Sequence, residues 1–220
     1  MTTDFSFLKK TVTIITLAFF AFALAYSAYL GNATVMGTET AFYLLVSDST
    51  HTQASAELVQ LSGGAGYILS QNGKDCVAYS AYSKESDCVL AKDSVEEGSI
   101  VRLDCGQLYF KGKDKGKANA VYGTMQSLYG CISVLEQEIA RLERGATQES
   151  SKRILSTLGK QFAYLSKNCE GVASEYAYAC NNAYKTIETL CEDIVYASKL
   201  RHLHCSLCES YARICDAYAL

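Results

Sequence analysis

The pattern of apolar and polar positions divides the chain into an apolar N-terminal run, a mixed middle region and a helical second half. Residues 11–30, TVTIITLAFFAFALAYSAYL, carry no charge. As a helix rising ~1.5 Å per residue, this run is long enough to cross a bilayer core of ~30 Å. Lys9 and Lys10 precede it and no Lys or Arg follows until Lys74. The sequence therefore predicts a single-pass transmembrane helix, with residues 1–10 in the cytoplasm and the remaining chain outside it.

A cleaved signal peptide is the alternative interpretation of the same run. Ala23-Leu24-Ala25 matches the small-residue pattern that precedes signal-peptide cleavage. Both interpretations place most of the chain outside the cytoplasm. The polar residues 31–40 that follow are predicted to form a short linker, which would keep the next domain close to the membrane if the helix is retained.

Residues 41–105 alternate between strand and helix patterns. Asn72-Gly73 lies between two apolar runs and predicts a β-hairpin, because both residues tolerate the positive φ of a type I′ turn. The order strand, helix, strand, strand, helix, strand predicts an α+β module with a four-stranded sheet and both helices on one face. The segments that follow the Ala41 strand are a helix at 51–61, the hairpin from Tyr67 to Tyr82, a second helix at 83–95 and a last strand at 100–105.

This order of elements resembles the SPOR domain, a peptidoglycan-binding module of bacterial envelope proteins associated with sporulation and cell division. The runs FYLLVSDSTHTQASAEL and GAGYILSQNGKDCVAYSAYSKESD carry the resemblance through pattern and spacing. At the two strands where family members have V-Q-V-G-S-F-like and R-V-x-V-G-P-F-like motifs, this chain reads LLVSDS and CVAYSAY. The resemblance implies that glycan strands stripped of their stem peptides bind to the exposed face of the sheet.

Strand alternation predicts which residues would form that face. Phe42, Leu44, Val46, Val77 and Tyr79 are expected to face the two helices of the module. The opposite face then carries Cys76 and five residues that we assign to glycan binding: Tyr43, Leu45, Ser47, Ala78 and Ser80. The apolar members of this face support a competing hypothesis, in which the C-terminal helices of this chain or a protein partner cover it and the protein is a scaffold.

The second half of the chain has a helical period. Residues 106–117 are predicted to be a second linker, and apolar residues then recur every three or four positions from Val121 to Leu142, with Gly145 as a stop. A second helix is expected to end near residue 168. Because neither glycine nor proline occurs after Gly171, a third helix is predicted to run unbroken to the C-terminus. Residues 118–220 should therefore form an elongated three-helix bundle.

Composition and motifs narrow the functional classes. The net charge of −3 argues against nucleic-acid binding. Seven of the ten cysteines lie in helical patterns, which favours mostly free thiols over a disulfide framework. The stretch HLHCSLC at 202–208 contains metal-ligand residue types, but its spacing along one helix favours packing. No catalytic motif occurs, so we expect a noncatalytic protein without a cofactor, whose partners are the membrane, glycan strands and possible envelope proteins.

Overall fold

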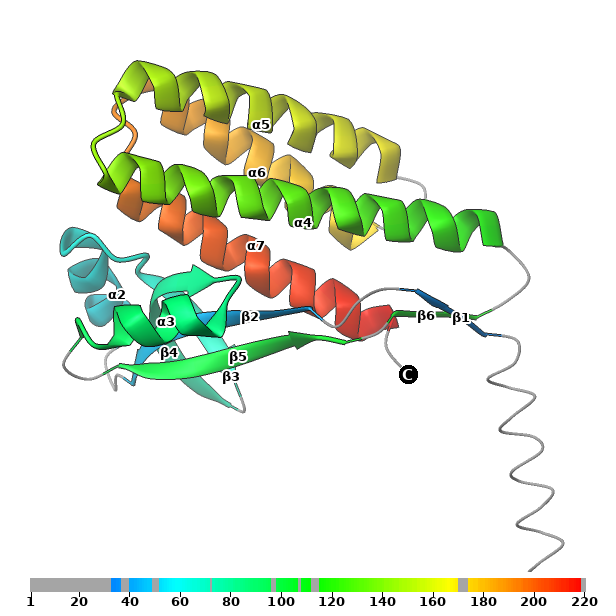
Figure 1. The fold of residues 1–220 in the computed structure, drawn as a ribbon, viewed down its shortest axis with the longest axis horizontal. Coiled ribbons are helices and arrows are strands. Elements are labelled where there is room, and N and C mark those ends of the chain that lie inside the picture. Colours follow the sequence, from blue (N-terminus) through cyan, green and yellow to red (C-terminus); the bar gives the residue numbers. More distant parts are fainter. Residues whose placement is uncertain are drawn as a thin grey trace, which may run out of the picture.

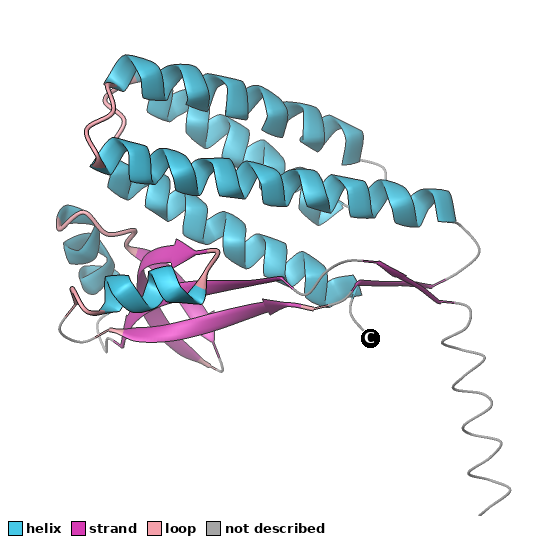
Figure 2. Cartoon of the chain, viewed as in Figure 1, coloured by secondary structure: helices cyan, strands magenta, loops and turns pink. Residues whose placement is uncertain are grey.

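The computed structural model describes residues 33–36, 40–48, 52–71, 73–95, 98–106, 108–111, 115–169 and 174–218. The predicted cytoplasmic segment 1–10 and transmembrane helix 11–30 lie outside these residues. Within the described ranges, none of the helices has both the length and the apolar character needed to span a bilayer. The chain is an α+β protein, in agreement with the predicted fold class (Figures 1 and 2).

The middle region forms an antiparallel sheet with the strand order β3-β4-β2-β5. The predicted hairpin is confirmed: β3 pairs with β4, and Gly73 in the connecting turn has a φ of 75°. Helix α2 follows the first strand of this sheet and helix α3 follows the hairpin. The elements are β2 (Thr40–Asp48), α2 (Thr52–Leu61), β3 (Tyr67–Gln71), β4 (Lys74–Tyr82), α3 (Glu85–Lys92) and β5 (Ser99–Cys105).

A bulge in β4 changes which residues share a face of the sheet. Leu45 of β2 lies opposite Ser80, but the next residue, Val46, lies opposite Ala78, so Tyr79 is an extra residue on β4. An extra residue interrupts the strict alternation of side chains along a strand. Ala78 consequently shares a face with Val46, whereas Ser80 shares the other face with Leu45.

The face that carries Val46 and Ala78 is covered by the helical half of the chain. Figure 1 shows α7 between the sheet and the other long helices. Phe42 is fully buried there, with ring centroids 5.8 Å from Tyr129 of α4 and 5.7 Å from Tyr211 of α7. Sheet and helices thus share one hydrophobic core. The four long helices are α4 (Lys115–Glu143), α5 (Gln148–Cys169), α6 (Ser174–Glu192) and α7 (Ala197–Tyr218).

The prediction of one unbroken helix from residue 172 to the C-terminus is wrong, because the chain leaves the helix between α6 and α7. The Gln148 side chain binds the backbone of Val195 in this break: it accepts a hydrogen bond from the amide (2.9 Å) and donates one to the carbonyl (3.0 Å). Val195 itself is buried. Gln148 and the buried Val195 therefore stabilise a break that contains no glycine or proline. As a result, four helices form instead of three.

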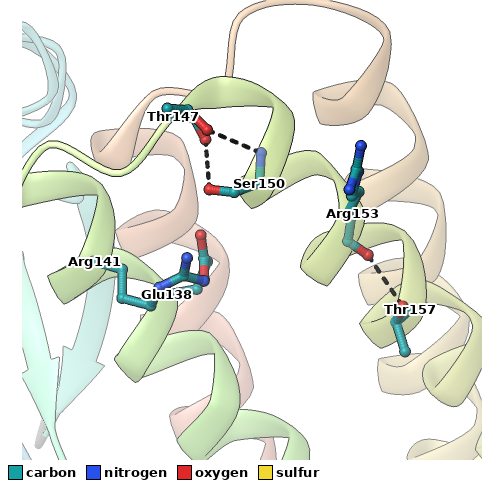
Figure 3. Close-up of polar contacts among 6 residues, drawn as sticks. All are labelled: Glu138, Arg141, Thr147, Ser150, Arg153 and Thr157. Carbon is teal, nitrogen blue, oxygen red and sulfur yellow. Dashed lines mark hydrogen bonds and ion pairs between the residues drawn. The ribbon is translucent and has the colours of Figure 1, made fainter.

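The turn between α4 and α5 follows the sequence prediction. Gly145 adopts a φ of 89°, and the Ala146 amide donates to the Arg141 carbonyl at 3.0 Å, as in a glycine-terminated helix. Thr147 then caps α5, since its hydroxyl accepts from the Ser150 amide at 3.3 Å (Figure 3). Figure 3 also shows Arg141 beside Glu138, whose buried carboxylate it neutralises at 2.6 Å.

Both predicted linkers contain strands, which is a correction to the predicted organisation. β1 (Ala33–Met36) lies in the segment 31–40, and β6 (Leu108–Lys111) lies in the segment 106–117. The two strands pair antiparallel, with Ala33 opposite Lys111 and Met36 opposite Leu108. Backbone pairing between segments more than 70 residues apart satisfies amide and carbonyl groups that each segment alone would leave to water.

Candidate functional site

The structure separates the five residues predicted to bind glycan. Ala78 is fully buried in the core shared with the long helices, because the β4 bulge places it on the α7 side of the sheet. Tyr43, Leu45, Ser47 and Ser80 lie on the other side, toward α2 and α3. The prediction that these five side chains share an open face opposite α2 and α3 is therefore wrong, because that face is covered by α7. Phe42, Leu44 and Val46, predicted to face α2 and α3, are instead buried in the core shared with the long helices.

Tyr43 shares this side of the sheet with the other three residues but packs against β5. Its ring is half-buried and packs against the Arg102 guanidinium, which lies 6.0 Å from the ring centroid. Arg102 is in turn paired with Asp104 at 2.7 Å. These neighbours belong to β5, on the edge of the sheet away from the hairpin. Tyr43 is thus part of a surface ion-pair cluster.

Leu45, Ser47 and Ser80 line a cleft between α2 and α3, with a volume of about 760 Å³. The sheet forms its floor, the C-terminal ends of the two helices form its walls, and Arg201 reaches it from α7. We call this the α2/α3 cleft. Its other lining residues are Ser62, Gly63 and Gly64 after α2, Tyr79 and Tyr82 of β4, and Ala91, Ser94 and Val95 around the end of α3.

Hydroxyl groups dominate the chemistry of the α2/α3 cleft. Four serines and two tyrosines are among its lining residues. The Ser62 hydroxyl donates to the Val59 carbonyl at 2.8 Å, which leaves its lone pairs able to accept. Burial raises the pKa of Tyr82, so this phenol keeps its proton and its ability to donate. The cleft can therefore both donate and accept hydrogen bonds around a bound molecule.

Arg201 closes one end of the cleft. Its guanidinium donates to the Gly63 carbonyl and pairs with Glu143 of α4. The side chain of Arg201 is 23% exposed and that of Glu143 is 40% exposed. Gly63 has a φ of 94°, so it lies in a turn of the backbone that glycine adopts readily. Arg201 thus joins the end of α2 to the helical half of the chain.

A second set of contacts attaches α7 to the start of β3. The His202 Nδ1 lies 3.0 Å from the Ala65 carbonyl, and the imidazole packs edge-on against Tyr67 with centroids 5.3 Å apart. The Tyr67 hydroxyl donates to Glu209. Burial and this carboxylate both raise the pKa of Tyr67, so the phenol stays protonated. Together with Arg201, these polar contacts fix the position of α7 over the sheet.

The histidine and cysteine stretch of α7 lies inside the core. His204 is fully buried, and its Nε2 is 3.7 Å from the Cys208 sulfur. Burial lowers the pKa of His204 to about 4, so the ring is neutral at pH 7. Across the described residues there is no group of three or more His, Cys, Asp or Glu side chains with the geometry of a metal site.

All ten cysteines are free thiols in the structure, and all except Cys191 are buried. Burial raises the pKa of most of them, to about 11 for Cys131 and about 12 for Cys180. Since the thiolate is the reactive form, these side chains act as small apolar groups.

Comparison with known proteins finds no matching family model, no matching curated protein and no matching solved structure. The α2/α3 cleft has to be interpreted from its own geometry. The sequence pattern predicted Leu45, Ser47 and Ser80 as site residues but gave no indication of Arg201 or Ser94. The Gly63-Gly64 pair was a usable signal for a close approach of chains, whereas nothing in the sequence links residue 201 to residue 63.

Proposed function

We propose that the protein is a noncatalytic cell-envelope scaffold, anchored by residues 11–30, whose sheet module and helices act as one rigid body. The observation that supports this best is the position of α7. It occupies the face of the sheet that the SPOR resemblance assigns to glycan, and it contributes Leu200, Leu203 and Leu207 to the common core. A sheet covered on that face is a structural element, because its apolar side chains are already used.

The contacts of α7 make its displacement costly. Ligand binding to the covered face would expose a fully buried Phe42 and would break the contacts that His202 and Arg201 make with the backbone after α2. Exposing one large buried side chain alone costs about 2 kcal/mol or more. Weak contacts with a sugar chain would have to supply this energy in addition to the ordinary costs of association.

Sedimentation with purified cell-wall sacculi tests this proposal. The full chain is mixed with sacculi before and after amidase removes the stem peptides, and hydrogen exchange of α7 is measured in both mixtures. We expect no enrichment on either form and unchanged protection of the α7 amides. Saturable binding to stripped sacculi, accompanied by faster exchange in α7, would show that α7 leaves the sheet and would refute the scaffold proposal.

Binding of peptidoglycan glycan is the second candidate. One observation favours it: three of the five residues assigned to glycan, Leu45, Ser47 and Ser80, come together in the hydroxyl-rich α2/α3 cleft. In the same experiment, binding to stripped sacculi with unchanged α7 protection would support this candidate, because the sheet would remain covered while the cleft holds the sugar chain.

A further inference from the structure

We propose that the α2/α3 cleft binds a small uncharged molecule that carries several hydroxyl groups, such as a polyol or a single sugar ring. This inference does not depend on the scaffold proposal, and it concerns a soluble ligand. Most of the cleft lining comes from the sheet and from the ends of α2 and α3, and α7 contributes Arg201 to it.

The size and lining of the cleft fit such a ligand. A volume of about 760 Å³ lies within the range of small-molecule sites, about 300 to 1,000 Å³. Ser47 lies on β2, Ser80 lies on β4 and Ser94 follows the end of α3, and all three line the cleft. Ser80 already pairs with the Tyr82 hydroxyl. A ligand with several hydroxyls can add hydrogen bonds to this group, which an apolar ligand cannot do.

The electrostatics of the cleft disfavour both signs of charge. The charges around it are already paired. Carbonyls in the last turns of α2 and α3 accept hydrogen bonds from the backbone amides that follow, and the Arg201 guanidinium is bonded to the Gly63 carbonyl and to Glu143. A charged ligand would lose its hydration without gaining a free counter-charge among the lining residues, whereas an uncharged ligand avoids this cost.

The floor of the cleft offers an apolar surface for the carbon side of such a ligand. Tyr79 lines the cleft and is half-buried, so part of it remains accessible to a ligand, whereas Leu45 is only 2% exposed and adds little contact area. Carbon-bound hydrogens on one side of a sugar ring pack well against aromatic and aliphatic side chains, while the hydroxyls point outward. The cleft therefore combines an apolar floor with a polar rim.

The walls of the cleft are fixed before any ligand binds. The Ala65 amide donates to the Tyr79 carbonyl at 2.7 Å, and the Gly64 amide donates to the Val59 carbonyl at 2.8 Å. A Cβ on Gly64 would lie 2.6 Å from the Val59 side chain, and one on Gly98 would lie 2.9 Å from the Leu45 side chain. These close approaches hold the cleft in one shape, which lowers the entropy cost of binding.

Titration of the full chain labelled with ¹⁵N-glycine tests the proposal. Gly63 and Gly64 report on the cleft, while Gly145 and Gly159 in the helical half are internal controls. The probes are glucose and myo-inositol as uncharged ligands, glucuronate as the anion and glucosamine as the cation. We expect saturable shifts at Gly63 and Gly64 with an uncharged probe in the millimolar range, and at least about tenfold weaker binding of both charged probes.

Two matched variants locate the binding. Ser94→Phe fills the cleft from an exposed position, and Asp93→Phe places the same side chain on the exposed neighbour that does not line it. Ser94→Phe should abolish the shifts and Asp93→Phe should preserve them, with both variants keeping the control resonances in place. The proposal is overturned if no probe gives saturable shifts, if a charged probe binds more tightly, or if Ser94→Phe binds like the wild type.

Discussion

Replacement of Phe42 by alanine is the most direct measurement of how firmly α7 covers the sheet. Phe42 lies on β2 and is fully buried between Tyr129 of α4 and Tyr211 of α7. Truncating a buried phenylalanine to alanine costs about 3–5 kcal/mol, and loss of an aromatic pair adds about 0.5–1.5 kcal/mol. If α7 covered the sheet only loosely, the side chain could be hydrated and the cost would be far smaller.

The matched control is Tyr43→Ala, the neighbouring residue on the opposite face. Tyr43 is half-buried and its ring packs beside Arg102, so its loss should cost about 1 kcal/mol. Urea denaturation followed by circular dichroism gives the free energy of unfolding of both variants, and hydrogen exchange reports on α7. We expect Phe42→Ala to lose at least about 3 kcal/mol and to speed exchange along α7. A loss no greater than that of Tyr43→Ala would refute the sealed-sheet interpretation.

Three further predictions concern single contacts. Gln148→Ala should lower the free energy of unfolding by about 1–2 kcal/mol in urea denaturation, because both hydrogen bonds to Val195 are lost. Gln148→Glu should lower it less, because its carboxylate still accepts from the Val195 amide. The pKa of His204 is about 4 in the folded state and 6.5 as its ordinary value, so the unfolded chain binds more protons between these pH values. The free energy of unfolding should therefore fall as the pH drops from 6.5 to 4, by at most about 1.4 kcal/mol per pH unit. His204→Gln should remove this contribution from the denaturation midpoints. In thermal melts, Gly64→Ala should destabilise the protein through its clash with the α2 end, while Gly123→Ala in α4, where an added Cβ meets nothing within 4 Å, should stabilise it by about 0.5–1 kcal/mol.

Local signals allowed much of the fold to be predicted. The strand and helix patterns of the middle region and the Asn-Gly turn depend on neighbours within a few residues, and the corresponding elements are present. Gly145 likewise ended α4 where the sequence placed a stop, because a positive φ after a helix is a local requirement. For the same reason the helical period was readable across α4 and α5.

The faces of the sheet were not readable in the same way. Alternation placed Ala78 and Ser80 together, but the extra residue Tyr79 separates them, and a bulge depends on pairing with β2. The break before α7 also had no local signal, since the partner that stabilises it is Gln148, 47 residues earlier. The strand pairing of β1 with β6 is another contact between distant segments.

The sequence by itself determined most of the secondary elements of this protein and the residue types available for a site, because propensity, turns and caps act over a few residues. Only the tertiary structure decided which surfaces remain free. Packing of α7 removed one face of the sheet from solvent, and the ends of α2 and α3 with Arg201 enclosed a hydroxyl-lined cleft on the other. Burial depends on the whole arrangement of the chain, and single segments do not encode it.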